Sequence, residues 1–135
     1  MQINKKTRVF GTLIPIIAVS VALIEPPHQK EDFKNLKVLP KDISSKDLQK
    51  IMVDEFQDGL GVGCSYCHAQ EKDSMHLDYA SDEKPEKEIA RLMMLMTLDI
   101  NKKYFGVEHP LIGDSVLTIS CSSCHHGTPH PDKTD

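Results

Sequence analysis

All four cysteines of the chain lie in two copies of one short pattern, Cys-x-x-Cys-His. The six residues that it fixes are Cys64, Cys67, His68, Cys121, Cys124 and His125. This pattern is the attachment signal for c-type haem, in which each thiol forms a thioether with a vinyl group of the porphyrin. The histidine that follows can then bind the iron through a ring nitrogen. The two copies therefore predict two covalently bound haem c groups, each with a histidine ligand.

Zinc binding and dithiol redox chemistry are two other uses of paired cysteines. Thiolates and histidines are suitable zinc ligands, but 53 residues separate Cys67 from Cys121, which is far more than in ordinary pairs of zinc knuckles. A thioredoxin-like dithiol would need a βαβ pattern around the motif, and the sequence does not show one. We therefore favour haem over both alternatives.

The second axial ligand of each iron has several candidates. For the first haem the best candidate is Met52, which is predicted to lie on a helix twelve residues before Cys64. For the second haem Met93, Met94 and Met96 compete. Helical methionines usually fill cores, so core filling and iron ligation both stay open for them. Four further histidines are alternatives, although each is typical of a solvated loop: His76, His109, His126 and His130.

A helix is needed to position Met52 ahead of the first motif. The sequence predicts that it begins at Ser44, which forms a weakened capping box with Asp47. Gly59 is the expected C′ residue at its other end, and two further glycines make the turn into the first cysteine. The first unit is thus an amphipathic helix, a turn and the haem motif.

A second helix is predicted to start between Ser81 and Pro85 and to end at Gly106. Before it, residues 70–81 are polar and are predicted to form a loop. After it, residues 115–119 are a short β-prone run into the second motif. Helical spacing predicts that its buried side is marked by Ile89, Leu92, Met93, Met96, Ile100 and Lys103/Tyr104. The resulting fold class is mainly α with little β structure.

The first 24 residues are typical of an export signal. Lys5, Lys6 and Arg8 precede an uncharged run over residues 9–24. Such a run suits a cleaved signal peptide or, slightly short of the ~17–25 residues of a bilayer span, an uncleaved membrane anchor. Residues 25–40 are then a linker and residues 41–135 a single dihaem domain. We expect the domain to be periplasmic. If residues 9–24 are retained as an anchor, they would attach it to the inner membrane.

The charge of the chain also restricts its partners. The formal net charge is −4, from 16 basic and 20 acidic residues. All three basic residues before residue 25 belong to the predicted signal, so the remainder has 13 basic and 20 acidic residues, a net −7. An acidic body argues against nucleic acid binding and suits a redox partner with a basic docking face. The same charge would also serve solubility alone.

Two stretches of the chain resemble haem-binding segments of the cytochrome subunit of photosynthetic reaction centres. The first comprises residues 51–52 and 60–68, and the second residues 79–101 and 121–127. The resemblance covers residues 39–131 and implies a helical methionine as the distal ligand in each unit. Carried over, Met52 takes the first iron. Met93, the first member of the family's Met-x-x-Met pair, takes the second, with Met96 as the fallback.

The chain departs from this family pattern in one respect. The photosynthetic subunit has four haems whereas this chain has two motifs, so the chain resembles half of it. Docking onto a reaction centre is therefore not implied. The chain is more similar to short dihaem relatives that serve as respiratory or general periplasmic carriers.

The sequence thus predicts a dihaem c-type cytochrome that carries out one-electron transfer between redox proteins. No general acid, nucleophile or substrate pocket is evident, so we expect an electron carrier and not an enzyme. Two alternatives stay open. A dihaem enzyme such as a peroxidase would need one iron with an exchangeable position. A haem-bearing sensor, or a subunit of a larger membrane complex, would need a partner protein.

Overall fold

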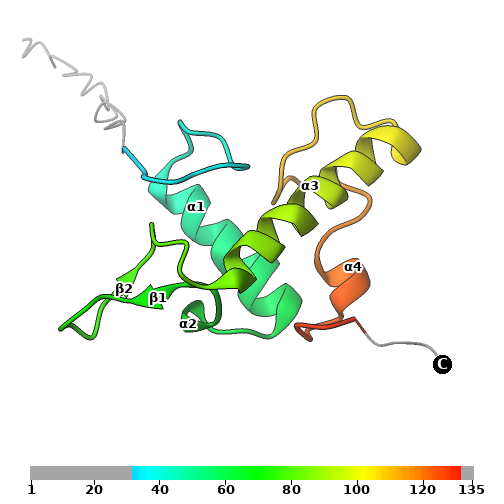
Figure 1. Ribbon diagram of the computed structural model, residues 1–135. Coiled ribbons are helices and arrows are strands. Elements are labelled where there is room, and N and C mark those ends of the chain that lie inside the picture. Colours follow the sequence, from blue (N-terminus) through cyan, green and yellow to red (C-terminus); the bar gives the residue numbers. More distant parts are fainter. Residues whose placement is uncertain (1–31, 132–135) are drawn as a thin grey trace, which may run out of the picture.

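The computed structural model describes residues 32–131, so the predicted signal or anchor over residues 1–24 lies outside the described residues. Within them the chain is mainly helical, as predicted, with one two-stranded sheet. The elements in chain order are α1 (Ser45–Ile51), η1 (Met52–Asp58), α2 (Cys64–Cys67), β1 (Ala69–Gln70), β2 (Leu77–Asp78), α3 (Pro85–Phe105) and α4 (Ser122–His125) (Figure 1). None of the helices in residues 32–131 combines the length and apolarity of a membrane span.

The first long helix begins where the sequence predicts but ends later. The Ser44 hydroxyl accepts a hydrogen bond from the Asp47 N–H at 3.1 Å, which caps α1. The helix continues without a break as the π-helix η1, a rare form that is frequent at functional sites. The prediction of Gly59 as the C′ residue is wrong, because its φ of −68° is right-handed and its N–H still bonds to the Asp54 carbonyl. The left-handed residue is Gly61, with a φ of 65°.

The second long helix, α3, has the predicted ends. Pro85 is at its start, and Gly106 follows its end with a left-handed φ of 69°. The predicted buried side is wrong, because Ile89, Leu92, Met93 and Met96 are 41–56% exposed. A different face is the buried one, and it carries Arg91, Met94, Thr97 and Asn101. The reason is that Met94 packs into the core cluster on that face.

The small sheet lies where a loop was expected, and the expected strand is absent. Within residues 70–81, Gln70 pairs with Leu77 in the antiparallel β1–β2 hairpin. Residues 115–119, predicted to be β-prone, form turns and bends instead. The backbone N–H groups of Thr118 and Ile119 both bond to the Asn101 side chain, at 2.8 and 3.1 Å. Because that amide of α3 takes up these donors, the segment needs no strand partner.

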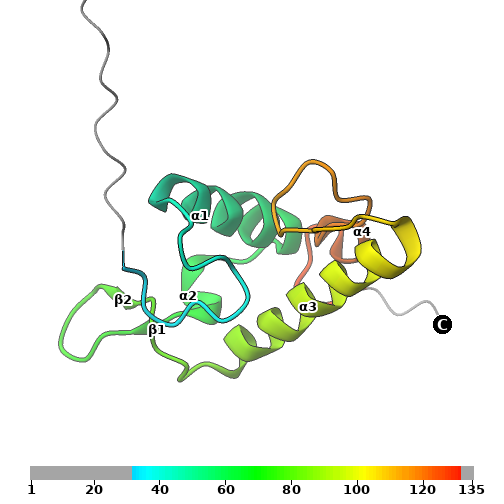
Figure 2. The ribbon, with the colours of Figure 1, turned by 90° about the horizontal axis from the view of Figure 1, so that it is seen from above.

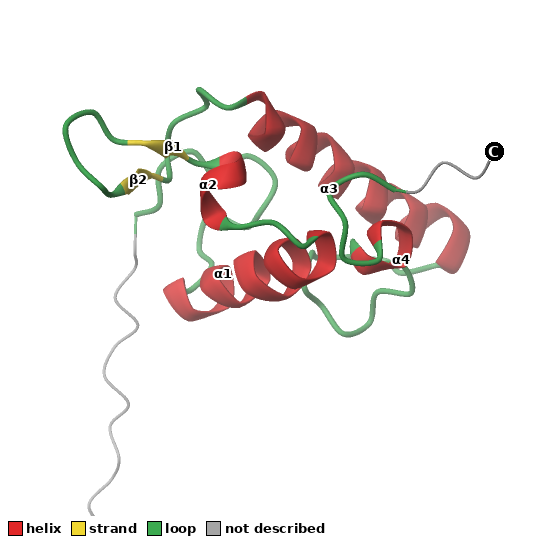
Figure 3. Ribbon diagram, turned by 90° about the horizontal axis from the view of Figure 1, so that it is seen from below, coloured by secondary structure: helices red, strands yellow, loops and turns green. Residues whose placement is uncertain are grey.

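The core is small and lies between the two long helices. Its buried members are Leu39, Ile51, Met94 and Ile112, so it joins the segment before α1, α1 itself, α3 and the loop after α3. Seen from above, α1 and α3 lie on opposite sides of the molecule, with α2 near the start of α3 and α4 beside the C-terminal half of α3 (Figure 2). Figure 3 shows α2 beside the β1–β2 hairpin and α4 beside the far end of the helix that begins with α1. The two Cys-x-x-Cys-His motifs therefore lie beside different parts of α3.

An ion-pair network joins the segment before α1 to the start of α3. The Asp82 carboxylate lies 2.9 Å from the Lys37 ammonium and 2.8 Å from the Arg91 guanidinium. It also accepts a hydrogen bond from the Asn35 side chain at 2.8 Å. The hydrogen bond from Lys37, followed by those from Arg91 and Asn35, holds the pKa of Asp82 well below its usual range. This network fixes residues 35–37 against α3.

Candidate haem-binding sites

Each Cys-x-x-Cys-His motif folds into a single helical turn. In α2 the His68 N–H donates to the Cys64 carbonyl at 3.0 Å, and in α4 the His125 N–H donates to the Cys121 carbonyl at 3.1 Å. The same hydrogen bond therefore closes both turns. All four thiols are free, so all of them are available for thioether formation.

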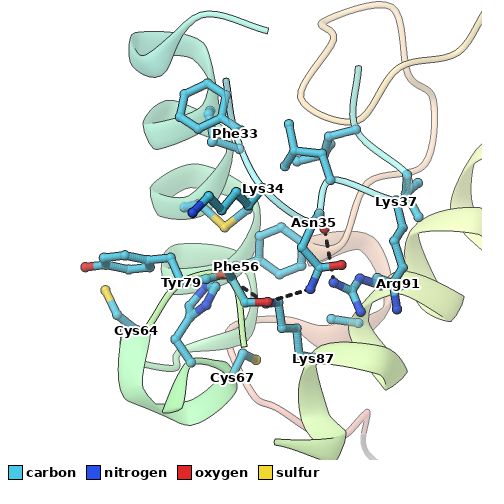
Figure 4. Close-up of a pocket in the computed structure, with 18 of the residues that line it drawn as sticks. Phe33, Lys34, Asn35, Lys37, Phe56, Cys64, Cys67, Tyr79, Lys87 and Arg91 are labelled. Carbon is cyan, nitrogen blue, oxygen red and sulfur yellow. Dashed lines mark hydrogen bonds between the residues drawn. The ribbon is translucent and has the colours of Figure 1, made fainter. Parts of the chain in front are cut away.

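The first motif lines a cavity of about 500 Å³, which lies within the ~300–1,000 Å³ range of cofactor sites. Cys64, Cys67 and His68 line it from α2, and Met52 lines it from η1. Its apolar walls come from the segment before α1, from η1 and from α3, and include Phe33, Leu36, Leu39, Phe56 and Met94. In Figure 4, Phe33, Phe56 and Tyr79 surround the space next to the two cysteines. The structure thus brings both predicted ligands of the first iron to one cavity, and ligation itself stays a prediction.

The second motif lines a smaller neighbouring cavity of about 240 Å³. Cys121, Cys124 and His125 line it, and both Met93 and Met96 reach it from α3. Three of the apolar residues that were expected to be buried by protein, Ile89, Met93 and Met96, are therefore cavity-lining residues. This apolar face suits contact with a porphyrin, and the choice between Met93 and Met96 stays a prediction.

Met94 lines both cavities and is 7% exposed within the protein core. Of the four histidines considered as alternative ligands, His130 lines the second cavity. The other three line neither cavity and are exposed: His76, His109 and His126. The structure thus leaves Met94 as a shared wall residue and keeps His130 as the histidine alternative for the second site.

The His125 ring is oriented as a metal-binding histidine requires. Its Nδ1 lies 3.0 Å from the Thr128 carbonyl oxygen, and a carbonyl can only accept, so Nδ1 carries the proton. Nε2 is then left with its lone pair for a metal. Thr128 is itself held in place, since its hydroxyl donates to the His125 carbonyl at 2.8 Å. This arrangement fits an axial ligand to haem iron.

The His68 ring is also suited to iron ligation. It packs edge-on against the Tyr79 ring, with 5.0 Å between the ring centroids. Burial lowers the pKa of His68, and the positive charge of Lys87 lowers it further, so the imidazole is held in the neutral form that binds metals. Its Nδ1 is buried without a hydrogen-bond partner among the described residues. This ring nitrogen is therefore not used in a structural hydrogen bond within the described residues.

One thiol of each motif is partly buried and the other is exposed. Burial, followed by the negative charge of Glu86, raises the pKa of Cys67. Burial and then Glu55 raise the pKa of Cys121 to about 12. In residues 32–131 no three His, Cys, Asp or Glu side chains gather as a metal-binding cluster.

Two residues that support the second motif were not singled out from the sequence. Asn101 is 0% exposed and binds residues 118–119, just before Cys121, through both its side-chain atoms. The Glu55 carboxylate accepts a hydrogen bond from the Cys121 N–H at 3.4 Å. The sequence did offer a signal for Glu55, because it is the one charged residue among the helically spaced apolar positions of the first helix. Asn101 gave a weaker signal, since it shares the helix face of Met94 and Thr97.

Three glycines hold the turn before the first motif against the turn after the second. The Gly127 N–H, two residues after His125, donates to the Gly59 carbonyl at 3.1 Å. A side chain at Gly61 would collide with the Gly127 carbonyl. The turn into the first motif thus lies directly against the turn that leaves the second, and this contact sets the relative position of the two sites.

Comparison with known proteins agrees with this chemistry. Over residues 4–134 the chain matches the family described as photosynthetic reaction centre cytochrome C subunit. It is 32% identical over 88 residues to cytochrome c-554 of Chloroflexus aurantiacus, which covers 65% of this chain and 19% of that protein. It is 28% identical over 116 residues to the photosynthetic reaction center cytochrome c subunit of Rubrivivax gelatinosus, covering 85% of this chain and 28% of that protein. The chain therefore spans less than a third of the length of either relative.

Proposed function

Since this chain belongs to the photosynthetic reaction centre cytochrome c subunit family, we propose that it is a dihaem c-type cytochrome that passes single electrons between redox proteins. The family consists of c-type cytochromes, which implies covalent haem c and electron transfer. The proposal of two haems is supported by the presence of two cavities among the described residues. Each cavity is lined by one complete Cys-x-x-Cys-His turn and by at least one methionine of a long helix.

The residues of the chain have separate tasks in this proposal. Cys64 and Cys67 would hold one haem and Cys121 and Cys124 the other, as thioethers. His68 and Met52 would bind the iron of the first site, and His125 and Met93 would bind that of the second, with Met96 as the fallback. When bound, haem supplies a ferric–ferrous couple for one-electron exchange.

The walls of the cavities would determine how that couple behaves. Apolar side chains such as Phe33 and Phe56 exclude water, and a dry, low-dielectric site reduces the reorganisation that accompanies a change of charge. The Thr128 carbonyl fixes the His125 ring. A methionine ligand opposite histidine raises the potential and leaves no open position for a substrate. These features support a carrier and not an enzyme.

We further place the protein in the periplasm, with residues 1–24 as its signal peptide or as its membrane anchor. Its partners would be redox proteins with a basic docking face, since the chain is acidic overall with a net charge of −4. Both relatives are several times longer than this chain, so attachment to a reaction centre is not part of the proposal.

Haem counting tests the proposal directly. The full chain is produced in a host with cytochrome maturation, and haem is measured as pyridine haemochrome against protein concentration. We expect two haems per chain in the natural protein, one in the Cys64→Ala/Cys67→Ala variant and one in the Cys121→Ala/Cys124→Ala variant. A natural protein that matures with one haem, or that is recovered without haem, would refute the dihaem assignment.

Ligand spectroscopy separates the carrier from a peroxidase-like enzyme. In a carrier both ferric irons are low-spin, and cyanide binds slowly or not at all because both axial positions are filled. A high-spin ferric haem that binds cyanide or peroxide rapidly would contradict the carrier and support the enzyme. A stable complex with a membrane oxidoreductase would instead support the subunit alternative.

A further inference from the structure

The two cavities differ sharply in charge. Lys87 and Arg91 reach the first cavity from α3 (Figure 4), and their side chains are only 12% and 7% exposed. Among the described residues, no lysine or arginine lines the second cavity. Positive charge therefore lies next to one of the two sites only.

The acidic groups near these cations are in a wetter environment. Asp82 pairs with both Lys87 and Arg91 and is 41% exposed. Glu88 lies 2.8 Å from Arg91 and is 56% exposed. Solvent therefore screens these two carboxylates more effectively than it screens the buried cations. Lys87 also donates to the backbone carbonyls of Tyr79 and Ser81, at 2.8 and 2.6 Å, and these bonds hold its ammonium in place. Three further acidic residues line the first cavity, and two of them are exposed: Asp32, Glu71 and the half-buried Asp78.

The two buried cations line the same cavity as His68, the predicted ligand of the first iron. Because both are largely buried, solvent screens their charges only weakly. Positive charge beside a redox group favours its reduced form, because reduction adds an electron to that group.

The charge next to the second site is negative. The half-buried Glu55 holds its carboxylate 3.4 Å from the Cys121 N–H, which places a negative charge beside an attachment residue of the second motif. Glu86 lines the second cavity, but its charge also acts on Cys67 of the first motif, so the contrast between the two sites rests on Glu55. A nearby negative charge favours the oxidised, more positive form of a haem.

We infer that Lys87 and Arg91 make the first haem the site of higher reduction potential, and that Glu55 makes the second the site of lower potential. This inference rests on the proposed dihaem function and assigns a direction to it. In a half-reduced protein the electron resides at the first haem, between α2 and η1. Electrons that enter at the second haem, beside α4, pass downhill to the first.

Potentiometric titration of the full-length protein, followed by visible absorption, tests the assignment. We expect two separate one-electron steps in the natural protein. Lys87→Gln should lower the potential of the upper step by about tenfold in the equilibrium constant, which is ~59 mV for one electron. The potential of the lower step should not change. Glu55→Gln should raise the lower step and leave the upper step in place. Lys87→Arg, which keeps the charge, should restore the upper step.

Two control variants remove the same charges at exposed positions. Lys103→Gln changes a lysine of the same helix α3 whose side chain is 62% exposed and pairs with Asp99. Asp54→Asn changes the acidic residue next to Glu55, which is 48% exposed and pairs with Lys50. Both should leave the two steps unchanged, because solvent screens these charges.

A second variant guards against misfolding of Lys87→Gln. Lys34 also lines the first cavity and is exposed, so Lys34→Gln should lower the upper step by a smaller amount. A shift of the lower step in either lysine variant, or shifts no larger than those of the controls, would overturn the inference. Haem content distinguishes this from failure of the proposed function, since two haems with unmoved potentials refute only the inference.

Discussion

Replacement of Asn101 by alanine should destabilise the protein at the second haem site. The Asn101 side chain is fully buried and makes three hydrogen bonds outside its own helix. It accepts from the N–H groups of Thr118 and Ile119 at 2.8 and 3.1 Å, and it donates to the Ile119 carbonyl at 2.7 Å. These bonds hold the segment that leads to Cys121 against α3. Their loss should free this segment.

The size of the effect follows from the hydrogen bonds. Three bonds at ~1 kcal/mol each give a loss of ~3 kcal/mol. Alanine regains roughly 0.6 kcal/mol as the better helix former. The expected net loss is therefore about 2–3 kcal/mol, a large part of the ~5–15 kcal/mol that stabilises a typical domain.

Urea unfolding of the haem-loaded protein, followed by far-ultraviolet circular dichroism, measures this loss. The midpoint should fall without a change in slope, and amide hydrogen exchange should accelerate at Thr118 and Ile119. Lys102→Ala, an exposed neighbour on the same helix, is the matched control and should stay within ~0.5 kcal/mol of the natural protein. If Asn101→Ala is no less stable than that control, or if exchange at the two amides is unchanged, the assigned role of Asn101 is wrong.

Three further substitutions probe the remaining contacts. Gly61→Ala should lower the free energy of unfolding by more than ~2 kcal/mol, because a left-handed φ alone costs ~1–2 kcal/mol and the new methyl group meets the backbone after the second motif. The control Gly63→Ala, with open space around it, should stay within ~0.5 kcal/mol of the natural protein. Equal losses in the two variants would contradict the contact. Asp82→Asn should lower the urea midpoint at pH 7. Because the pKa of Asp82 is lowered in the folded state, its stabilisation is fully present above the unfolded value of ~3.9 and is lost progressively as the pH falls from there through the lower pKa of the folded state. The difference between the two proteins should therefore shrink steadily between about pH 4 and about pH 2, and a constant difference would argue against an ionic role. Met52→Ala and Met93→Ala should each abolish the thioether-to-iron absorption band of one haem and lower its potential; unchanged spectra in either variant would assign that iron to another ligand.

The parts of this protein that follow from neighbouring residues were predictable. The two haem motifs are contiguous, and a one-turn helix is enough to form each of them. The start of α1 at Ser44 and both ends of α3 depend on capping groups and on backbone preferences within a few residues, and the structure confirms them. The mainly helical class follows from the same local signals.

The buried face of α3 was not predictable from apolar periodicity. The more apolar face carries Ile89, Met93 and Met96, and it lines the second cavity. The buried face includes Arg91 and Asn101, whose polar groups are satisfied by partners from residues 35 and 118–119. Hydrophobicity ranks the faces of a helix, but it does not distinguish a face that packs on protein from one that lines a cofactor cavity.

The sequence by itself therefore predicts the proposed haem attachment, because attachment needs only residues that are adjacent in the chain. Tertiary structure decided what surrounds each attachment point. It brings Lys87 and Arg91, which are 19 and 23 residues from His68, to the first motif. It brings Glu55, which is 66 residues from Cys121, to the second motif. Charges act through space and are strengthened by burial, so the environment of each motif depends on which distant segments the fold places beside it.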